Sequence, residues 1–237
     1  MILYWIMFYS AASGVAIYGR APFHRQRALL FALTLFYIFI VGFRYQVGCD
    51  WNSYLNAFNT ALTTEEWTSW TAISTDISFS FINLIIAAVS DEVVWVNLIC
   101  AVIALSGLYK FSSVQPSPLL AFLVAVPYIV IVFFQGYTRQ SAAFGFELWG
   151  LAALSQAKNY RFIIYILLAA TFHKTAIVLL PLAALVGSRN KWLIYFWVFC
   201  FFLIAYSSIL AESQDLWKYY VEQTMSSSGG GIRVALN

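Results

Sequence analysis

The chain has 237 residues, of which 62% are hydrophobic, 19% aromatic and 10% charged, and its formal net charge is +3. A soluble domain carries about a quarter charged residues, so this composition excludes a water-soluble domain and indicates an integral membrane protein. The Lys and Arg residues are scattered and form no basic stripe that could neutralise phosphates, which argues against a nucleic-acid partner.

The apolar runs predict membrane-spanning helices. About 20 apolar residues cross a bilayer as a helix, and runs of about 10 to 14 re-enter it or lie at its surface. No basic segment precedes the first run, as it would in a secretory signal, so this run is predicted to be a retained span. The predicted spans are 2–18, 27–43, 93–109, 119–135, 141–156 and 192–210.

Two further regions are predicted to be shorter helices. Residues 77–90 form a short apolar run that ends at Asp91 and Glu92. In residues 162–187, the motif FHKT at 172–175 separates two apolar stretches of about a dozen residues each. We expect two half-length helices that meet at a polar apex. The fold class is therefore all-α and polytopic, with about six full spans plus re-entrant or half-length helices.

The charges predict the orientation of the chain, because Lys and Arg accumulate in short cytoplasmic loops. If 77–90 lies at the interface and 162–187 forms a hairpin, every acidic residue except Glu147 falls outside. The cytoplasmic side then holds Arg20, Arg25, Arg27, Lys110, Lys158, Arg161, Arg189 and Lys191. If 77–90 crossed fully, the later basic loops would move outside, so the charges favour the first topology.

This topology predicts the domain organisation. We expect a single transmembrane domain over 1–237, with an extracytoplasmic loop at 44–78 and an extracytoplasmic tail at 211–237. The tail contains SSSGGG at 226–231, a composition typical of a flexible linker. The three cysteines, Cys49, Cys100 and Cys200, are odd in number and far apart, so no disulfide framework and no metal site is predicted.

Three basic residues fall on the outer side, against the orientation rule: Arg44 in FRYQVGCDWNSY, Arg139 in QGYTRQSA and Lys174 in TFHKTA. A role other than orientation is therefore indicated. Arginine offers a planar fork of donors that grips phosphate or carboxylate in two places. Two such forks from separate spans would suit a diphosphate at the membrane surface. The alternative for Arg44 is an interfacial anchor whose charge reaches water.

Five more residues are candidate site residues. Trp51 and Tyr54, beside Asp50, would suit the face of a sugar, with Asp50 accepting its hydroxyl hydrogens; the aromatics fit an interfacial belt equally well. Glu147 follows Gln140 by seven residues, on the same helix face and about 10 Å deeper. An acid inside a membrane span indicates function, and the alternative is a structural partner for Arg139 or another buried donor.

His173 is one of two histidines and lies at the predicted apex, beside Lys174. A neutral imidazole there could take the proton from a hydroxyl nucleophile, since the pKa of histidine suits a general base near neutral pH. A histidine in an apolar setting can instead be a packing residue, and the sequence leaves both readings open.

Together these clusters resemble the EpsG family of Wzy-type polysaccharide polymerases. The pattern covers residues 27 to about 187. It comprises Arg44, Gly48, Asp50 and Tyr54, then Gly136, Arg139 and Gln140, then Phe172, His173 and Pro181, together with DISFSFINLI at 76–85. Such proteins resemble the lipid-linked O-antigen ligases, which implies a GT-C-like polymerase or ligase architecture.

The resemblance implies a bacterial inner-membrane, multi-pass enzyme with its site on the extracytoplasmic face. It would transfer a glycan from undecaprenyl diphosphate to a hydroxyl of another lipid-linked repeat unit, within the lipid bilayer. Arg44, Arg139 and Lys174 would hold the diphosphate, His173, Asp50 and Glu147 would be catalytic candidates, and Trp51, Tyr54 and Gln140 would bind substrate. No cofactor or metal is implied, because basic side chains can stabilise the departing charge. A chain-length regulator and a flippase are possible partners by the same resemblance.

Two other classes of function stay open at this point. A lipid-linked glycan transporter or flippase would place its charges along a midplane route through broken helices. A membrane acyltransferase that modifies glycans would also use a histidine to activate a sugar hydroxyl. Family members usually continue through further spans, and the sequence leaves open whether this chain is a C-terminally truncated fragment.

Overall fold

The computed structural model describes residues 2–48, 50–63, 76–185, 191–192, 195–200 and 202–203. The chain divides into two compact units, Met1–Val186 and Gly187–Asn237. In the second unit the described residues are helical, so the predicted span 192–210 is described only in part. The predicted tail 211–237 lies outside the described residues. Every predicted site residue belongs to the first unit.

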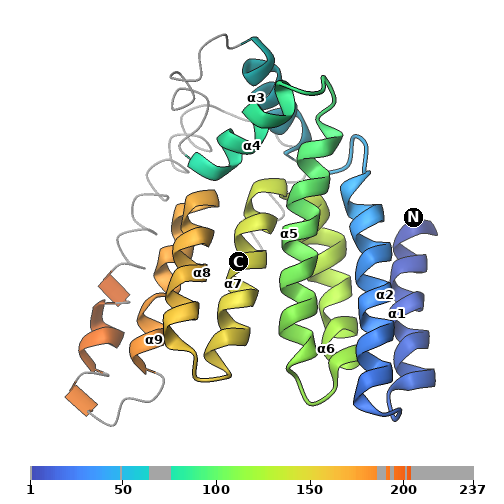
Figure 1. Cartoon of the computed structure of the whole chain (residues 1–237), viewed down its shortest axis with the longest axis vertical. Coiled ribbons are helices and arrows are strands. Elements are labelled where there is room, and N and C mark those ends of the chain that lie inside the picture. Colours follow the sequence, from blue (N-terminus) through green and yellow to red (C-terminus); the bar gives the residue numbers. More distant parts are fainter. Residues whose placement is uncertain are drawn as a thin grey trace, which may run out of the picture. The chain divides into compact units, whose positions relative to one another are not determined.

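Every regular element described in the first unit is a helix, which confirms the all-α prediction (Figure 1). In chain order these are α1 (Ile2–Tyr18), α2 (Phe23–Gly42), α3 (Trp51–Thr63), α4 (Ile77–Ala87), α5 (Val94–Ser113), α6 (Pro118–Ala125), the π-helix η2 (Val126–Phe134), α7 (Thr138–Leu154), α8 (Asn159–Phe172), the 3-10 helix η3 (Lys174–Leu179) and α9 (Pro181–Leu185).

Two of the described helices, α2 and α5, are long and apolar enough to cross a membrane by length and composition. Each has 20 residues, which corresponds to about 30 Å of helix, the thickness of the hydrocarbon core. Shorter apolar helices occupy Ile2–Tyr18, Pro118–Phe134 and Asn159–Phe172. The positions of the apolar helices agree with the predicted runs, while the number of full spans stays a prediction.

Prolines lie at the starts of α2 and α6 and at the transition from α6 to η2. Pro22 is the N-cap of α2, and Pro118 opens α6. Proline suits the start of a helix because its missing N–H has no partner there anyway. Pro127 lies where α6 passes into η2; inside a helix the missing donor disturbs the regular bonding pattern, which accounts for the change of helix type at this point.

Helices α5 and α7 approach each other so closely that their backbones meet. A Cβ atom on Gly107 would lie 2.1 Å from the carbonyl oxygen of Gly145, and one on Gly145 would lie 2.5 Å from that of Ile103. Small residues permit this kind of close crossing between apolar helices. The start of α7, which bears Arg139, is thereby fixed against α5.

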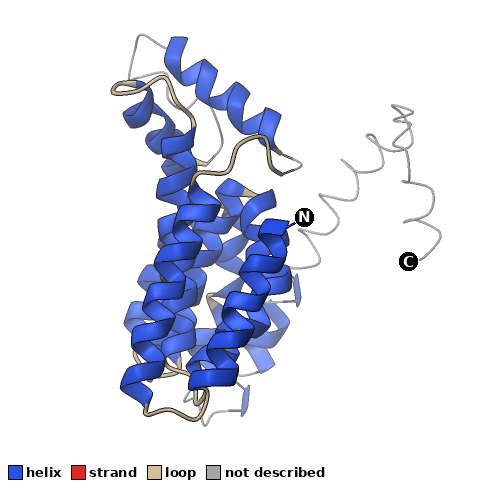
Figure 2. Ribbon diagram, turned by 90° about the vertical axis from the view of Figure 1, so that its right-hand side faces the viewer, coloured by secondary structure: helices blue, strands red, loops and turns tan. Residues whose placement is uncertain are grey.

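A second group of helices gathers around one apolar cluster and carries the polar residues of interest. Its buried members include Tyr54 and Phe58 from α3, Phe79 from α4, Ala142 from α7 and Phe172 from α8. Helix α3 lies within the predicted loop 44–78, and its buried residues Tyr54, Phe58 and Ala61 share one face. In both views α3 and α4 lie at one end of the longer helices (Figure 2).

The predicted break at 172–175 is confirmed. Helix α8 ends at Phe172, His173 is extended with φ −153°, and η3 begins at Lys174. The Nδ2 atom of Asn159, at the start of α8, donates to the carbonyl oxygen of Ala183 at 3.4 Å, so the chain returns beside α8 as a hairpin. Helix α4 has 11 residues, about 16 Å, which is too short to cross a bilayer.

Candidate active site

The loop after α2 lies directly against the segment that precedes α7. Gly48 has φ +110°, and a Cβ atom there would lie 2.6 Å from the carbonyl oxygen of Gln135 and 2.9 Å from that of Gly136. Only glycine adopts this backbone conformation readily and permits this approach. The contact brings Arg44 and Asp50, which flank Gly48 in sequence, to the start of α7, where Arg139 lies.

Arg44 is buried, with 7% of its surface exposed. Its Nη1 atom donates to the carbonyl oxygen of Val41 at 2.9 Å, and its Nη2 atom donates to Oγ1 of Thr138. The Thr138 hydroxyl then donates to Oδ1 of Asn97 at 3.2 Å. Burial lowers the pKa of Arg44 to about 10, so the guanidinium keeps its charge at neutral pH. Arg44 therefore joins the end of α2 to α7 and, through Thr138, to α5.

Arg139 forms an ion pair with Asp76, the residue before α4, with 2.6 Å between Nη1 and Oδ2. The side chain of Arg139 is 30% exposed and that of Asp76 is 5% exposed. Asp76 thus holds one edge of the guanidinium, while part of the Arg139 side chain remains exposed. Of the two arginines, Arg139 is the one that a substrate can reach.

Three buried donors at this place have no hydrogen-bond partner among the described residues. They are Nε of Arg44, Nε of Arg139 and Nδ2 of Asn97. Buried polar atoms in proteins are nearly always hydrogen-bonded, so unpaired ones call for a partner. All three are donors, and two belong to cations, so an anion or water oxygen is the complementary partner.

Tyr54 links Asp50 to both arginines. Its hydroxyl donates to Oδ2 of Asp50 at 3.4 Å. Burial raises the pKa of Tyr54, the negative charge of Asp50 raises it further, and the positive charges of Arg139 and Arg44 oppose the rise. The Tyr54 hydroxyl is therefore protonated at neutral pH, and Asp50, Arg139 and Arg44 each lie close enough to Tyr54 to affect its ionisation.

Three other predicted site residues make no side-chain hydrogen bond or ion pair with Arg44, Asp50, Tyr54 or Arg139 among the described residues. Trp51 packs edge-on against Tyr45, with 5.6 Å between ring centroids, and Tyr45 is exposed. Gln140 is half-buried in the first turn of α7. Lys174 is exposed at the start of η3. Their predicted roles in binding substrate and diphosphate stay predictions.

His173 is tied to the cluster through α4. It caps the end of α8, and its backbone N–H donates to the carbonyl oxygen of Ala169 at 2.9 Å. Two residues earlier, Oγ1 of Thr171 accepts a hydrogen bond from the Ser78 hydroxyl of α4 at 2.7 Å. Asp76, which pairs with Arg139, directly precedes α4. Helix α4 therefore also contacts the end of α8 that bears His173.

Glu147 lies apart from these residues. It is half-buried, eight residues beyond Arg139 on α7, which corresponds to about 12 Å along the helix axis. The ion-pair partner of Arg139 is Asp76, so the suggested pairing of Glu147 with Arg139 is wrong. The catalytic role of Glu147 stays a prediction.

Sequence reasoning gave no site role to Asp76, Thr138 or Asn97. Each had a signal. Asp76 is an acidic residue at the start of an apolar helix, and Asn97 is an amide within an apolar span. Polar groups in such places need partners. Their partners lie far away in sequence and become visible only in the folded chain.

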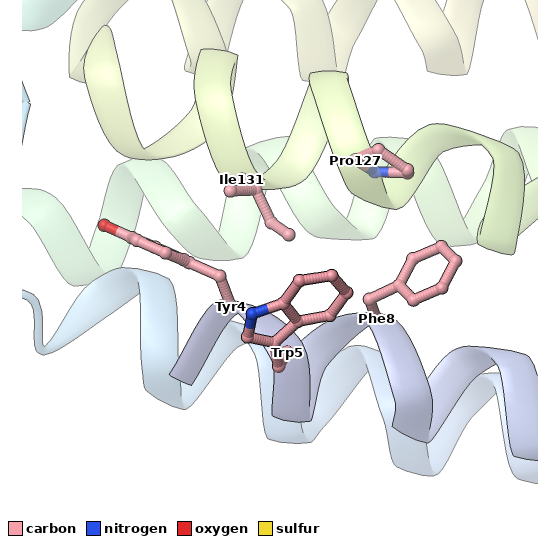
Figure 3. A pocket seen from close by; sticks show the side chains of 5 residues that line it. All are labelled: Tyr4, Trp5, Phe8, Pro127 and Ile131. Carbon is pink, nitrogen blue, oxygen red and sulfur yellow. The ribbon is translucent and has the colours of Figure 1, made fainter. Parts of the chain in front are cut away.

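The structure also has an apolar hollow of about 350 Å³ between α1 and η2. Its lining consists of Tyr4, Trp5, Phe8, Pro127 and Ile131 (Figure 3). No charged side chain lines it, and it shares no residue with the polar cluster. Charged side chains that could act on a substrate therefore lie in the cluster around Arg139 and not in this hollow.

A bundle of apolar helices with arginines, carboxylates and a histidine gathered at one end defines a helical membrane protein with a charged site. The model of the EpsG family matches residues 27–237. The chain therefore belongs to the EpsG family. No curated protein and no solved structure gives a significant match.

Membership in this family indicates a membrane-associated role in polysaccharide biosynthesis. The function that it implies is a polymerase of the glycosyltransferase kind, with a lipid-linked sugar as substrate.

Proposed function

We propose that this protein extends a polysaccharide on the outer face of the bacterial inner membrane. It transfers a growing glycan from undecaprenyl diphosphate to a hydroxyl of another lipid-linked repeat unit. The observation that carries the proposal is the partly exposed side chain of Arg139, in a member of the EpsG family, within a cluster that α4 links to His173.

The leaving group is a diphosphate, and cations stabilise it as it departs. Arg139, whose side chain is partly exposed, supplies N–H donors from the part of its fork that Asp76 does not hold. Lys174 adds a second accessible charge. Arg44, buried beneath with both Nη atoms engaged, adds a fixed positive charge and positions the start of α7 through Thr138.

The nucleophile is a sugar hydroxyl, and His173 is the proposed base. As the hydroxyl oxygen attacks the anomeric carbon, its proton passes to the imidazole. The bond between the anomeric carbon and the diphosphate oxygen breaks, and the electron pair leaves with the diphosphate. Asp50, held by the Tyr54 hydroxyl, accepts hydroxyl hydrogens of a sugar, while Trp51 offers an aromatic face and Gln140 an amide.

The test uses purified protein in lipid nanodiscs with an undecaprenyl-diphosphate oligosaccharide. Wild type should produce a ladder of longer glycans. Arg139→Ala should lower the rate about 100- to 1000-fold, as the loss of one charge-stabilising donor does. His173→Ala should lower it at least about 100-fold, as the loss of a general base does.

Matched controls come from the same chain. Arg161→Ala removes an exposed arginine from the first turn of α8, and His24→Ala removes the other histidine, which is exposed in the first turn of α2. Both should leave the ladder unchanged. Substrate that crosses a vesicle without chain growth would show a transporter instead, and transfer of an acyl group to the glycan would show an acyltransferase.

A further inference from the structure

The first turn of α4 contacts two different helices through two polar bonds. Asp76 pairs with Arg139 of α7, and Ser78 donates to Thr171 in the last turn of α8. Residues two positions apart point to different sides of a helix start. The beginning of α4 is therefore bonded on one side to the helix of Arg139 and on another to the helix that ends at His173.

The carboxylate of Asp76 is used in an unusual way for its position. Asp76 is the N-cap of α4, yet its side chain makes no cap hydrogen bond to the described helix. An aspartate at an N-cap commonly accepts such a bond and stabilises the helix. Here the carboxylate is buried and reaches Nη1 of Arg139 at 2.6 Å. The Asp76 carboxylate therefore contacts Arg139 and does not cap α4.

The geometry of this pair fixes the arginine fork. A long side chain such as arginine has many rotamers, and a bond to one of its terminal nitrogens restricts them. With Nη1 held by the buried Asp76, the rest of the guanidinium has a defined direction. Preordered donors bind an anion more effectively than donors that must first be ordered.

We propose that Asp76 and Ser78 are positioning residues, which set the diphosphate-binding Arg139 and the base-bearing end of α8 at a fixed separation. The inference rests on the proposed polymerase function. Asp76 acts on the binding of the diphosphate because it orients Arg139. Ser78 acts on the transfer step because its bond to Thr171 fixes the end of α8 next to His173.

The experiment separates binding from turnover in the full chain. The affinity for inorganic pyrophosphate, the KM and kcat for glycan extension, and the melting temperature are measured for each variant. Asp76→Asn should weaken pyrophosphate binding about tenfold and raise KM more than it lowers kcat, because the fork is no longer held. Asp76→Glu, which keeps the carboxylate, should restore part of the affinity and serves as the second variant.

Loss of the contact between Ser78 and Thr171 has a different expected effect. Ser78→Ala should leave pyrophosphate affinity unchanged and lower kcat about tenfold, as a displacement of a catalytic group does. Ser78→Thr keeps the hydroxyl and should retain most of the rate. Asp91→Asn, which removes an exposed carboxylate from the loop after α4, is the matched control and should change none of these quantities.

Three results would overturn the inference. Tighter pyrophosphate binding by Asp76→Asn would mean that Asp76 competes with the substrate for Arg139. A lower melting temperature with unchanged affinity, KM and kcat would make both contacts structural only. Loss of affinity in Ser78→Ala would mean that the two contacts do not act separately.

Failure of the proposed function gives a different pattern. If wild type neither binds pyrophosphate nor extends glycan, the polymerase assignment fails and the inference fails with it. If wild type does both, Arg139→Ala loses both and Asp76→Asn behaves as wild type, the polymerase assignment survives and the inference alone is refuted.

Discussion

Gly48 offers the sharpest test of how the loop after α2 builds the site. Its φ of +110° lies in a region that L-residues rarely adopt, and a Cβ atom would lie 2.6 Å from the backbone oxygen of Gln135. The obstructing atom belongs to the backbone, so it cannot rotate away as a flexible side chain would. Gly48→Ala must therefore strain the loop or move it away from the start of α7.

The expected cost follows from these two effects. A residue forced into a sparsely populated backbone conformation costs about 1–3 kcal/mol, and overpacking costs about as much again, so the loss of stability is about 2–6 kcal/mol. For a chain of this size each kcal/mol corresponds to about 2–4 °C. The melting temperature should fall by at least about 4 °C. Displacement of Arg44 and Asp50 should also stop glycan extension.

The assay measures the protein that stays monodisperse after heating in detergent, together with the glycan ladder. Gly136→Ala is the matched control, since nothing lies within 4 Å of a Cβ atom at that position. If Gly48→Ala melts and polymerises like Gly136→Ala, the account of how the loop is fixed against α7 is refuted.

Three further predictions concern Arg44, the crossing of α5 and α7, and the orientation of the chain in the membrane. Arg44→Lys should lower glycan extension at least about tenfold, because the ammonium keeps the charge but lacks the planar fork whose two Nη atoms reach Thr138 and the carbonyl at the end of α2. Gly107→Ala should lower the melting temperature by several degrees, because a Cβ atom 2.1 Å from the backbone oxygen of Gly145 forces α5 and α7 apart at a cost of about 1–3 kcal/mol. Cysteine at the exposed Asn56 of α3 should react with an impermeant maleimide added to intact spheroplasts.

Each of these has its own control and contrary result. Arg161→Lys should leave extension unchanged, and equal rates in wild type and Arg44→Lys would remove the anchoring role. Gly136→Ala again controls for added volume, and an unchanged melting temperature for Gly107→Ala would contradict the close crossing. The labelling uses a chain whose native cysteines are replaced by serine. Cysteine at Gln156 should label only after permeabilisation, and the reverse pattern at the two sites would overturn the orientation.

Apolar run length and charge placed most helices of the first unit correctly. The break at His173 was predictable because FHKT interrupts an apolar stretch that would otherwise continue. Helix α3 was missed, since its polar content suggested a loop. Its apolar residues Tyr54, Phe58 and Ala61 nevertheless repeat at helical spacing and are buried, so the signal was present at lower strength.

The sequence identified charged residues of the candidate site, but it did not show which of them contact one another. The sequence identified Arg44 and Arg139 as unusual charges, and equal roles were expected of them. Burial separates them, because Arg44 is engaged by Val41 and Thr138 while Arg139 is partly exposed. The pairing of Arg139 with Asp76 joins residues far apart in the chain. Local patterns carry no information on which distant segments pack together, so this contact required the folded structure.

The break between α8 and η3 has a consequence for water in the membrane. A helix that ends leaves backbone carbonyls without partners inside it, and hydrocarbon can satisfy neither these nor a charged amine. Lys174 and Thr175 are exposed at this break, so the apex must be hydrated, as part of the aqueous surface or of a wet recess that opens to it. Each glycosidic bond formed releases one proton, and hydration beside His173 would give that proton a path to bulk solvent.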